Sequence, residues 1–239
     1  QEKPTAYINA RIIPIVGQPI EQGVMIVQNG KITAVGDART VRLSADVQTV
    51  DLKGRVIMPG LIDTHSHIGE GSGADGSSPM QPDVRIMDAI NARASSIQRA
   101  QSGGLTTVNV MPGSGHLNSG QTLYLKLRDG ALIDDLLIRY EDGRIAGGMK
   151  FAIGTNPLRA GRRAGSDASK LPARDLAMEA LVEVLDGRRV VHFHTHRHDD
   201  ILTAIRLSKE FGFRMVLQHV SEAWKVADEI ARAKVPASI

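Results

Sequence analysis

Short β-branched runs alternate with amphipathic segments at the end of the chain. The runs "RVVHFHTH", "FRMVLQHV" and "VPASI" are separated by "DDILTAIRLSKEFG" and "SEAWKVADEIARAK". Gly212 is placed to end the first amphipathic segment as a helix, and Ser221 to begin the second. Units of this length are typical of parallel strands joined by helical crossovers, so this part of the chain predicts an α/β fold.

The same alternation extends back to residue 59. A Gly- and Ser-rich stretch, 69–78, follows the first strand of the series and is expected to form a mobile loop over the strand ends. The apolar spacing of Val84, Met87, Ile90, Ala94 and Ile97 predicts one long helix. We expect strands at 61–67, 105–111 and 148–154, and helices over 83–101 and 173–185.

The N-terminal residues have a different pattern. Between residues 6 and 56, short β-branched runs are broken by turn residues, and Asn29-Gly30 separates two of them in "GVMIVQNGKITAVG". Asn-Gly favours a tight hairpin turn because both turn residues take positive φ. We therefore expect a small antiparallel β domain over residues 1–58, followed by a larger α/β domain over 59–239.

Composition excludes several classes of protein. The 29 basic and 26 acidic residues give a formal charge of +3 with no basic block, which does not suggest a nucleic-acid partner. No apolar run approaches the ~20 residues of a membrane span. Without cysteine, metal ligands must be histidine, carboxylate or a modified side chain. Because the sequence begins at Gln1, we expect an exported bacterial protein, periplasmic or secreted, more than a cytoplasmic one.

Histidines are clustered in the sequence. Eight histidines in 239 residues form four His-x-His pairs, at 65/67, 192/194, 194/196 and 196/198. A random arrangement of this composition would contain about 0.3 such pairs. Residues i and i+2 of a strand point to the same face, so each pair projects two imidazoles together. Core histidines held by hydrogen bonds are the alternative to metal ligands, but several histidines at the carboxyl ends of parallel strands favour a metal site.

The strand pattern also ranks the histidines of "VVHFHTHRHDD". Val191 and Phe193 are expected to face the helices, which turns the alternate histidines inward. His194 or His196 lies near the carboxyl end and is the better candidate ligand, whereas His192 lies deeper and is expected to be structural. His198 is expected to have a solvated or capping role.

The run "VIMPGLIDTHSHIG", placed after a small β unit, resembles the opening of the amidohydrolase superfamily, and the closest branch is imidazolonepropionase-like and prolidase-like. The resemblance implies a (β/α)8 TIM-type barrel, incomplete in this chain at about seven strands, with a partial N-terminal β-sandwich. It also implies a divalent metal, with zinc expected, as one or two ions. By this resemblance the metal ligands are His65 and His67 on strand 1, His194 on strand 5 and His219 on strand 6.

"GGMKFAIGTNP" carries Lys150 near the end of what would be strand 4. In binuclear members of the superfamily a lysine at this place is carboxylated and bridges two metal ions. An ordinary lysine or a charged substrate contact is the alternative. The family's catalytic aspartate ends strand 8, which would lie beyond residue 239. We therefore expect this sequence to be a fragment, or a partner chain to supply the remaining strands.

The resemblance implies hydrolysis of an amide or cyclic amide C–N bond by a metal-activated water, with an N-acyl amino acid, dipeptide or imidazolone-like compound as substrate. A deaminase of the same superfamily and a non-catalytic relative are the alternatives. We expect a small-molecule substrate and a homo-oligomer. The candidate substrate contacts are His116, His196, Arg159 and Arg163, the arginines because they can bind a carboxylate, although a solvated basic loop is the alternative for them.

Overall fold

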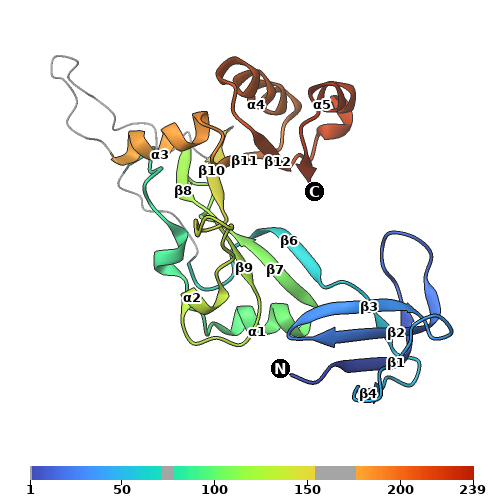
Figure 1. Ribbon diagram of the computed structural model, residues 1–239. Helices are drawn as coiled ribbons and strands as arrows, with labels where there is room; N and C mark the ends of the chain where they lie inside the picture. The colour runs from blue at the N-terminus through green and yellow to red at the C-terminus, as the bar shows by residue number, and fades with distance from the viewer. Residues whose placement is uncertain (1, 72–77, 154–175) are drawn as a thin grey trace, which may run out of the picture. The chain divides into compact units, whose positions relative to one another are not determined.

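The computed structural model describes residues 2–71, 78–153 and 176–239. The chain divides into two compact units, residues 1–60 and 61–239, and each is described by itself. Figure 1 shows the strands and helices of both units. The predicted loop at 69–78 lies largely outside the described residues, as do Arg159 and Arg163.

Unit 1 is a single five-stranded sheet. Its strand order is β3-β2-β1-β4, with β5 also paired to β1. The β2–β3 hairpin turns at Asn29 and Gly30, which have φ values of 50° and 71°, as the sequence predicted. The strands are β1 (Thr5–Ile12), β2 (Ile20–Gln28), β3 (Lys31–Asp37), β4 (Gln48–Asp51) and β5 (Val56–Ile57).

Unit 1 differs from the prediction in two respects. Only β1, β2 and β3 are antiparallel, whereas β4 and β5 run parallel to β1 because residues 38–47 carry the chain back before β4 begins. The described residues 2–60 form one sheet, so the predicted partial β-sandwich is not confirmed in this part of the chain.

Unit 2 contains two sheets. The first has the order β6-β7-β9, with β6 (Leu61–Ser66) parallel to β7 (Leu105–Val110) and β9 (Leu123–Lys126) antiparallel to β7. The second has the order β13-β12-β11-β10-β8, and its first four strands are parallel. It consists of β8 (Asn118–Gln121), β10 (Gly148–Ala152), β11 (Val190–Thr195), β12 (Met215–His219) and β13 (Ala237–Ser238).

The strands predicted in unit 2 are therefore present, with parallel pairing. The described residues do not form a closed barrel, because the two sheets remain separate. What is observed is an α/β unit in which six parallel strands place their carboxyl ends at sheet edges, where ligands of such folds bind.

Helices cover one face of the second sheet. In Figure 1, α4 and α5 lie on the same side of β11 and β12. No helix in the described ranges is long and apolar enough to cross a membrane. The helices are η1 (Ile86–Ala89), α1 (Ser95–Ser102), α2 (Ile133–Leu136), α3 (Leu176–Leu185), α4 (His198–Phe211), η3 (Ala223–Lys225) and α5 (Ala227–Ala233), where η denotes a 3-10 helix.

The single helix predicted over 83–101 is wrong. The chain forms η1 and α1 instead, separated by residues 90–94. Asn91 causes the break: its backbone N–H donates to the Gly69 carbonyl, and its side-chain oxygen accepts from the N–H of Arg93. Such side-chain bonds compete with the helical pattern. The segment 221–234 is likewise divided into η3 and α5, whereas α4 ends at Gly212 with φ 72°, as predicted.

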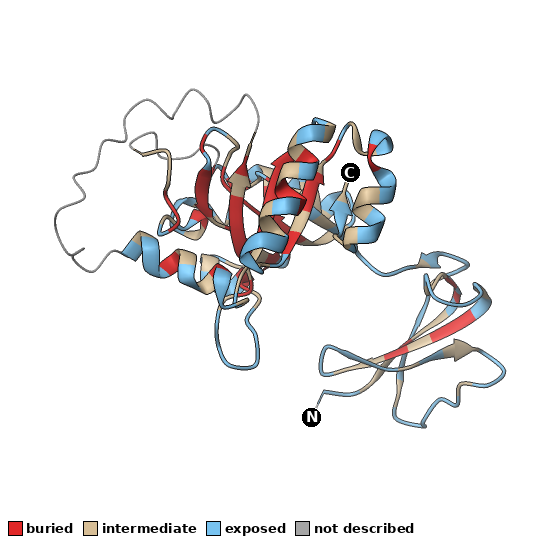
Figure 2. Cartoon of the chain, turned by 90° about the horizontal axis from the view of Figure 1, so that it is seen from above, coloured by how far each residue is buried: buried red, intermediate tan, exposed pale blue. Residues whose placement is uncertain are grey.

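The two faces of the second sheet of unit 2 carry different side chains, and the apolar face packs against the helices. Val191, Phe193 and Leu217 pack against Ile201 and Ala204 of α4. Figure 2 shows that the central strands are almost entirely buried. Because side chains alternate along a strand, burial of Val191 and Phe193 under the helices turns His192 and His194 to the opposite face, as expected.

Candidate metal centre

Four histidines meet where β6, β11 and β12 end. The ring centroids of His65 and His219 lie 4.2 Å apart, and those of His194 and His219 lie 4.6 Å apart. His67, which directly follows β6, lies 5.1 Å from His65. The tertiary structure thus brings together the four histidines that the sequence named as candidate ligands, from three strands far apart in the chain.

The hydrogen-bond partners of His65 and His67 determine which ring nitrogen carries the proton. Nδ1 of His67 donates to the Met111 carbonyl at 2.8 Å, and Nδ1 of His65 donates to the side-chain oxygen of Gln218 at 3.2 Å. A neutral imidazole then has its lone pair on Nε2. The two Nε2 atoms lie 3.3 Å apart, so two lone pairs face each other. A cation placed between them would relieve this repulsion, and the pair is therefore suited to a metal ion.

Lys150 lies directly beside this pair. It is fully buried in the middle of β10, and its Nζ lies 3.4 Å from Nε2 of His65 and 3.5 Å from the sulfur of Met111. Within the described part of the chain no carboxylate pairs with it. Because burial penalises the charged amine, the pKa of Lys150 is lowered to about 7. A substantial fraction of Lys150 is therefore neutral and nucleophilic at ordinary pH.

Three histidines of this cluster, His65, His194 and His219, have lowered pKa values. Burial, together with the nearby charge of Lys150, lowers the pKa of His65 to about 3 and that of His194 to about 3. The pKa of His219 is lowered by the same causes. Neutral imidazole is the form that binds a metal ion, so these rings need no deprotonation before binding.

His219 reaches the cluster through a strained backbone. Strand alternation alone would place it on the same face as Leu217, under the helices. Instead His219 has φ 69° and is the central residue of a γ-turn in which the Val220 N–H donates to the Gln218 carbonyl at 2.9 Å. This form of γ-turn is rare and strained. The strain reorients the imidazole toward His65 and His194, as occurs at functional sites.

His194 and His196 differ in environment. His194 is buried, and its Nδ1 lies 2.9 Å from the Ser114 hydroxyl. His196 is exposed just after β11, its Nδ1 lies 2.9 Å from the Ser221 hydroxyl, and its ring stacks on His219 at 5.2 Å. His194 therefore lies inside the cluster, whereas His196 lies at its solvent side.

The remaining histidines have other surroundings. His116 is buried between β7 and β8, and its Nδ1 has no hydrogen-bond partner among the described residues. His198 begins α4 without capping it, and its Nδ1 lies 2.7 Å from Glu222. Of the two expected roles, capping and solvated, the structure agrees with the solvated one, because the His198 side chain is 45% exposed beside Glu222. His192 is buried and hydrogen-bonded, as expected for a structural residue.

The cluster is not a preformed ligand sphere. Among residues 2–71, 78–153 and 176–239, no three His, Asp or Glu side chains are arranged around a common point as ready ligands. The imidazoles contact one another instead. The chemistry of the donor set nevertheless fits a divalent ion, since the ring nitrogens of four histidines and the amine of Lys150 lie close together, with the Met111 thioether as the nearby sulfur.

Three contacts of the cluster were not predicted from the sequence. These are the Met111 carbonyl, the Ser114 hydroxyl and the Gln218 side chain. Gln218 directly precedes His219, and a glutamine inside an otherwise apolar strand was the available signal. Its partner could not be derived, because the partner depends on the register between distant strands.

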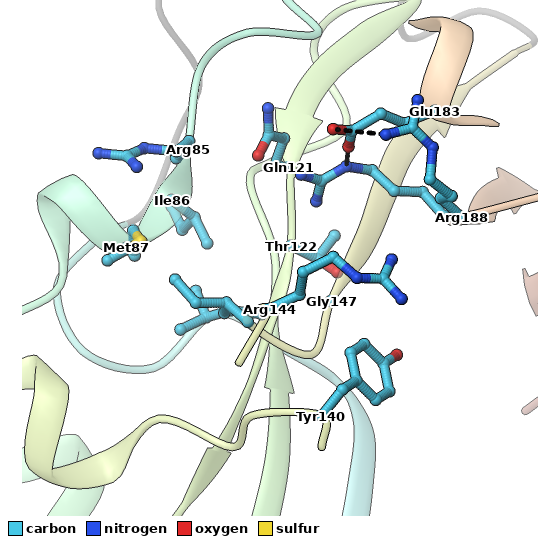
Figure 3. Close-up of a pocket in the computed structure, with 13 residues that line it drawn as sticks. Arg85, Ile86, Met87, Gln121, Thr122, Tyr140, Arg144, Gly147, Glu183 and Arg188 are labelled. Atoms are coloured by element: carbon cyan, nitrogen blue, oxygen red, sulfur yellow. Dashed lines mark hydrogen bonds and ion pairs between the residues drawn. The ribbon is translucent and has the colours of Figure 1, made fainter. Parts of the chain in front are cut away.

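A cavity of about 240 Å³ lies elsewhere in unit 2 (Figure 3). It includes Gly147 and Arg189, which directly precede β10 and β11, together with Tyr140. Its arginines 188 and 189 pair with Glu183, so part of their charge is neutralised. None of the eight histidines, all of which are described, lines it. Since it lies where the strands begin, it is not part of the histidine cluster.

Comparison with known proteins identifies the family. An amidohydrolase from Thermotoga maritima MSB8 matches 98% of this chain and 69% of its own, with a TM-score of 0.86 and 30% identity. The chain belongs to the amidohydrolase superfamily. No family model matches the sequence.

Curated relatives match a shorter part of this amidohydrolase-superfamily chain. The imidazolonepropionase of Rhizobium rhizogenes is 38% identical over 65 residues, which are 26% of this chain and 16% of that protein. The adenine deaminase of Dehalococcoides mccartyi strain CBDB1 is 39% identical over 67 residues, 28% of this chain and 11% of that protein. The matches thus span less than a fifth of either curated relative, and the two relatives carry out different reactions.

Proposed function

We propose that this protein is a metal-dependent hydrolase that cleaves an amide or cyclic amide C–N bond. The observation that carries the proposal is the pair of opposed Nε2 atoms of His65 and His67, 3.3 Å apart beside the buried amine of Lys150. Membership of the amidohydrolase superfamily supports it. The matched imidazolonepropionase suggests the cyclic-amide class.

We assign His65, His67, His194 and His219 as metal ligands, with zinc as the expected ion because the donors are imidazole nitrogens. A divalent ion held there supplies an activated water and polarises a substrate carbonyl at neutral pH. The Met111 carbonyl orients the His67 ring, and the Gln218 amide orients the His65 ring, each through Nδ1 of that ring. Burial lowers the pKa of His65 and of His194, which favours the neutral imidazole that binds a metal ion.

Lys150 is proposed to act in carboxylated form. Its neutral amine would form an N–C bond with CO2, release one proton to solvent and become a carbamate. That product is an anionic oxygen ligand in place of a buried cation, which removes the unfavourable charge beside His65. Such a lysine would allow two metal ions to be bound.

Substrate contacts remain proposals. His196 is exposed beside His219 and could stabilise a developing oxyanion. Nδ1 of His116 has no hydrogen-bond partner among the residues that the structure describes, and it could serve a polar substrate group. Arg159 and Arg163, outside the described residues, are proposed to bind a carboxylate, which would select N-acyl amino acids, dipeptides or acidic cyclic amides. We assign no general base among the described residues.

Metal content and substrate turnover of the full-length protein test this proposal together. We expect bound divalent metal and hydrolysis of a compound from a panel of N-acyl amino acids, dipeptides and imidazolone-like rings. His67→Ala should lose metal and activity, whereas His198→Ala, which removes a histidine outside the cluster, should retain both. Absence of bound metal from the wild-type protein would favour a non-catalytic relative.

A deaminase is the second candidate, because the adenine deaminase match has nearly the same length and identity as the imidazolonepropionase match. Deaminases of the superfamily usually use one metal ion and no bridging lysine. Ammonia release from adenine, with one ion per chain and unmodified Lys150, would establish this alternative. About two ions with carboxylated Lys150 would support the amide hydrolase.

A further inference from the structure

Four polar side chains from four strands form a continuous, largely buried series of contacts behind the proposed metal centre. Nδ1 of His65 on β6 lies 3.2 Å from Oε1 of Gln218 on β12. Nε2 of Gln218 lies 2.9 Å from Nδ1 of His192 on β11, and Nε2 of His192 lies 3.3 Å from the amide nitrogen of Asn109 on β7. Gln218 and Asn109 are fully buried and His192 nearly so.

Within this series of contacts, Gln218 determines which ring nitrogen of His65 carries the proton. A side-chain amide has one accepting oxygen and one donating nitrogen. With Oε1 toward His65, the proton of that imidazole must lie on Nδ1, and Nε2 keeps its lone pair. With the amide turned over, nitrogen would face His65, Nδ1 would have to accept, and the proton would move to Nε2, which could then bind no metal ion.

The side chains next to His65 and to Gln218 determine which orientation of the Gln218 amide is favoured. Nζ of Lys150, a donor, lies 3.4 Å from Nε2 of His65 and favours a lone pair there. Nε2 of Gln218 donates to Nδ1 of His192, which therefore carries its proton on Nε2. The side-chain oxygen of Asn109 has no partner among the described residues, and it would accept that proton if the amide turned by 180°.

The structure also makes room for His192. An added Cβ at Gly148 would lie 2.6 Å from Cδ2 and 2.8 Å from Nε2 of the His192 ring. A glycine at the start of β10 therefore leaves room for the His192 ring, which contacts Gln218 and Asn109.

We infer that Gln218 is a positioning residue that holds His65 in the Nδ1–H tautomer, with its amide nitrogen directed toward Nδ1 of His192. The inference rests on the proposed metal centre for its purpose, but its structural content concerns the metal-free protein. Gln218 contacts neither metal nor substrate in this assignment and acts only through His65.

Substitutions at Gln218 separate positioning from packing. Gln218→Met keeps the volume but removes the acceptor, and we expect zinc affinity to fall about 10- to 100-fold, as is usual for such outer contacts. Gln218→Glu still offers an oxygen to Nδ1–H of His65, and we expect it to retain most of the affinity. Gln121→Met, on β8 and with its amide bonded to the Pro82 carbonyl, is the matched control and should bind zinc normally.

The measurements are zinc affinity by chelator competition and long-range ¹H–¹⁵N spectra of the histidine rings in the metal-free protein. We expect wild-type His65 to be protonated on Nδ1, and the spectra need no variant to fold. An Nε2–H tautomer in wild type, or wild-type zinc affinity in Gln218→Met, would overturn the inference. Failure of the wild type to bind zinc despite the expected tautomer would instead refute the proposed function alone.

Discussion

Nζ of Lys150 lies 3.4 Å from Nε2 of His65 in the interior of unit 2, and no carboxylate pairs with it in the described ranges. A buried amine with an imidazole and a thioether as its nearest polar contacts is unfavourable as a cation. It becomes favourable once it is neutral or converted to an anion beside a metal ion. Lys150 is therefore expected to lower the free energy of unfolding of the metal-free protein, although the proposed function requires it.

Lys150→Met is expected to stabilise the metal-free protein by about 1–3 kcal/mol while abolishing binding of a second metal ion. Methionine fills a similar volume without a charge to desolvate, and replacement of buried charge by apolar groups is often stabilising. Urea unfolding in chelator and metal analysis measure the two effects. Lys225→Met, which removes an exposed partner of Glu222, should change stability by less than about 0.5 kcal/mol. A destabilised Lys150→Met protein would contradict this account.

The metal-free protein is expected to lose stability as the pH falls from 6.5 toward 3. The pKa of His65 and of His194 is about 3 in the folded protein, against 6.5 for an ordinary histidine. Above pH 6.5 both states are neutral at these sites. At lower pH the unfolded chain binds protons that the folded protein does not, so the free energy of unfolding decreases. Urea titrations at several pH values should show a smaller decrease for His65→Gln, and an equal decrease would be evidence against burial of a neutral ring.

Gly148→Ala is expected to destabilise the protein by about 2 kcal/mol or more. The new Cβ would lie 2.5 Å from the Val190 carbonyl oxygen and 2.6 Å from the His192 ring, so strand and ring would both have to move. Gly115→Ala is the control, because no atom lies within 4 Å of its added Cβ. Thermal unfolding of both variants tests this, and equal midpoints would mean that His192 is not confined as described.

His219→Gly is expected to be more stable than His219→Ala by about 1 kcal/mol in the metal-free protein. Both variants remove the imidazole, but only glycine accepts φ 69° without strain. Denaturant unfolding of the two proteins compares them directly. If alanine is equally stable, the backbone at this position is not strained and the reorientation of His219 has another cause.

Local pattern alone predicted much of this protein. The hairpin at Asn29-Gly30, the strands that carry His65, His192 and His194, and the end of α4 at Gly212 follow from turn chemistry and from periods of two and 3.6 residues. These signals arise within a few residues of sequence, so no tertiary contact is needed to read them. Proximity of His194 and His219 also followed, because β11 and β12 are neighbouring parallel strands whose carboxyl ends share one edge.

The tertiary structure decided what depends on distant partners. Asn91 interrupts the predicted helix by bonding to Gly69, and Gln218 meets His65 only through the packing of β6 against β12. His219 turns toward the cluster against the alternation of its own strand. In each case a local preference is overridden by a contact with a residue at least twenty positions away in the chain. The sequence by itself therefore determined the kind of fold and the candidate ligands, whereas register and packing determined their tautomers, orientation and charge.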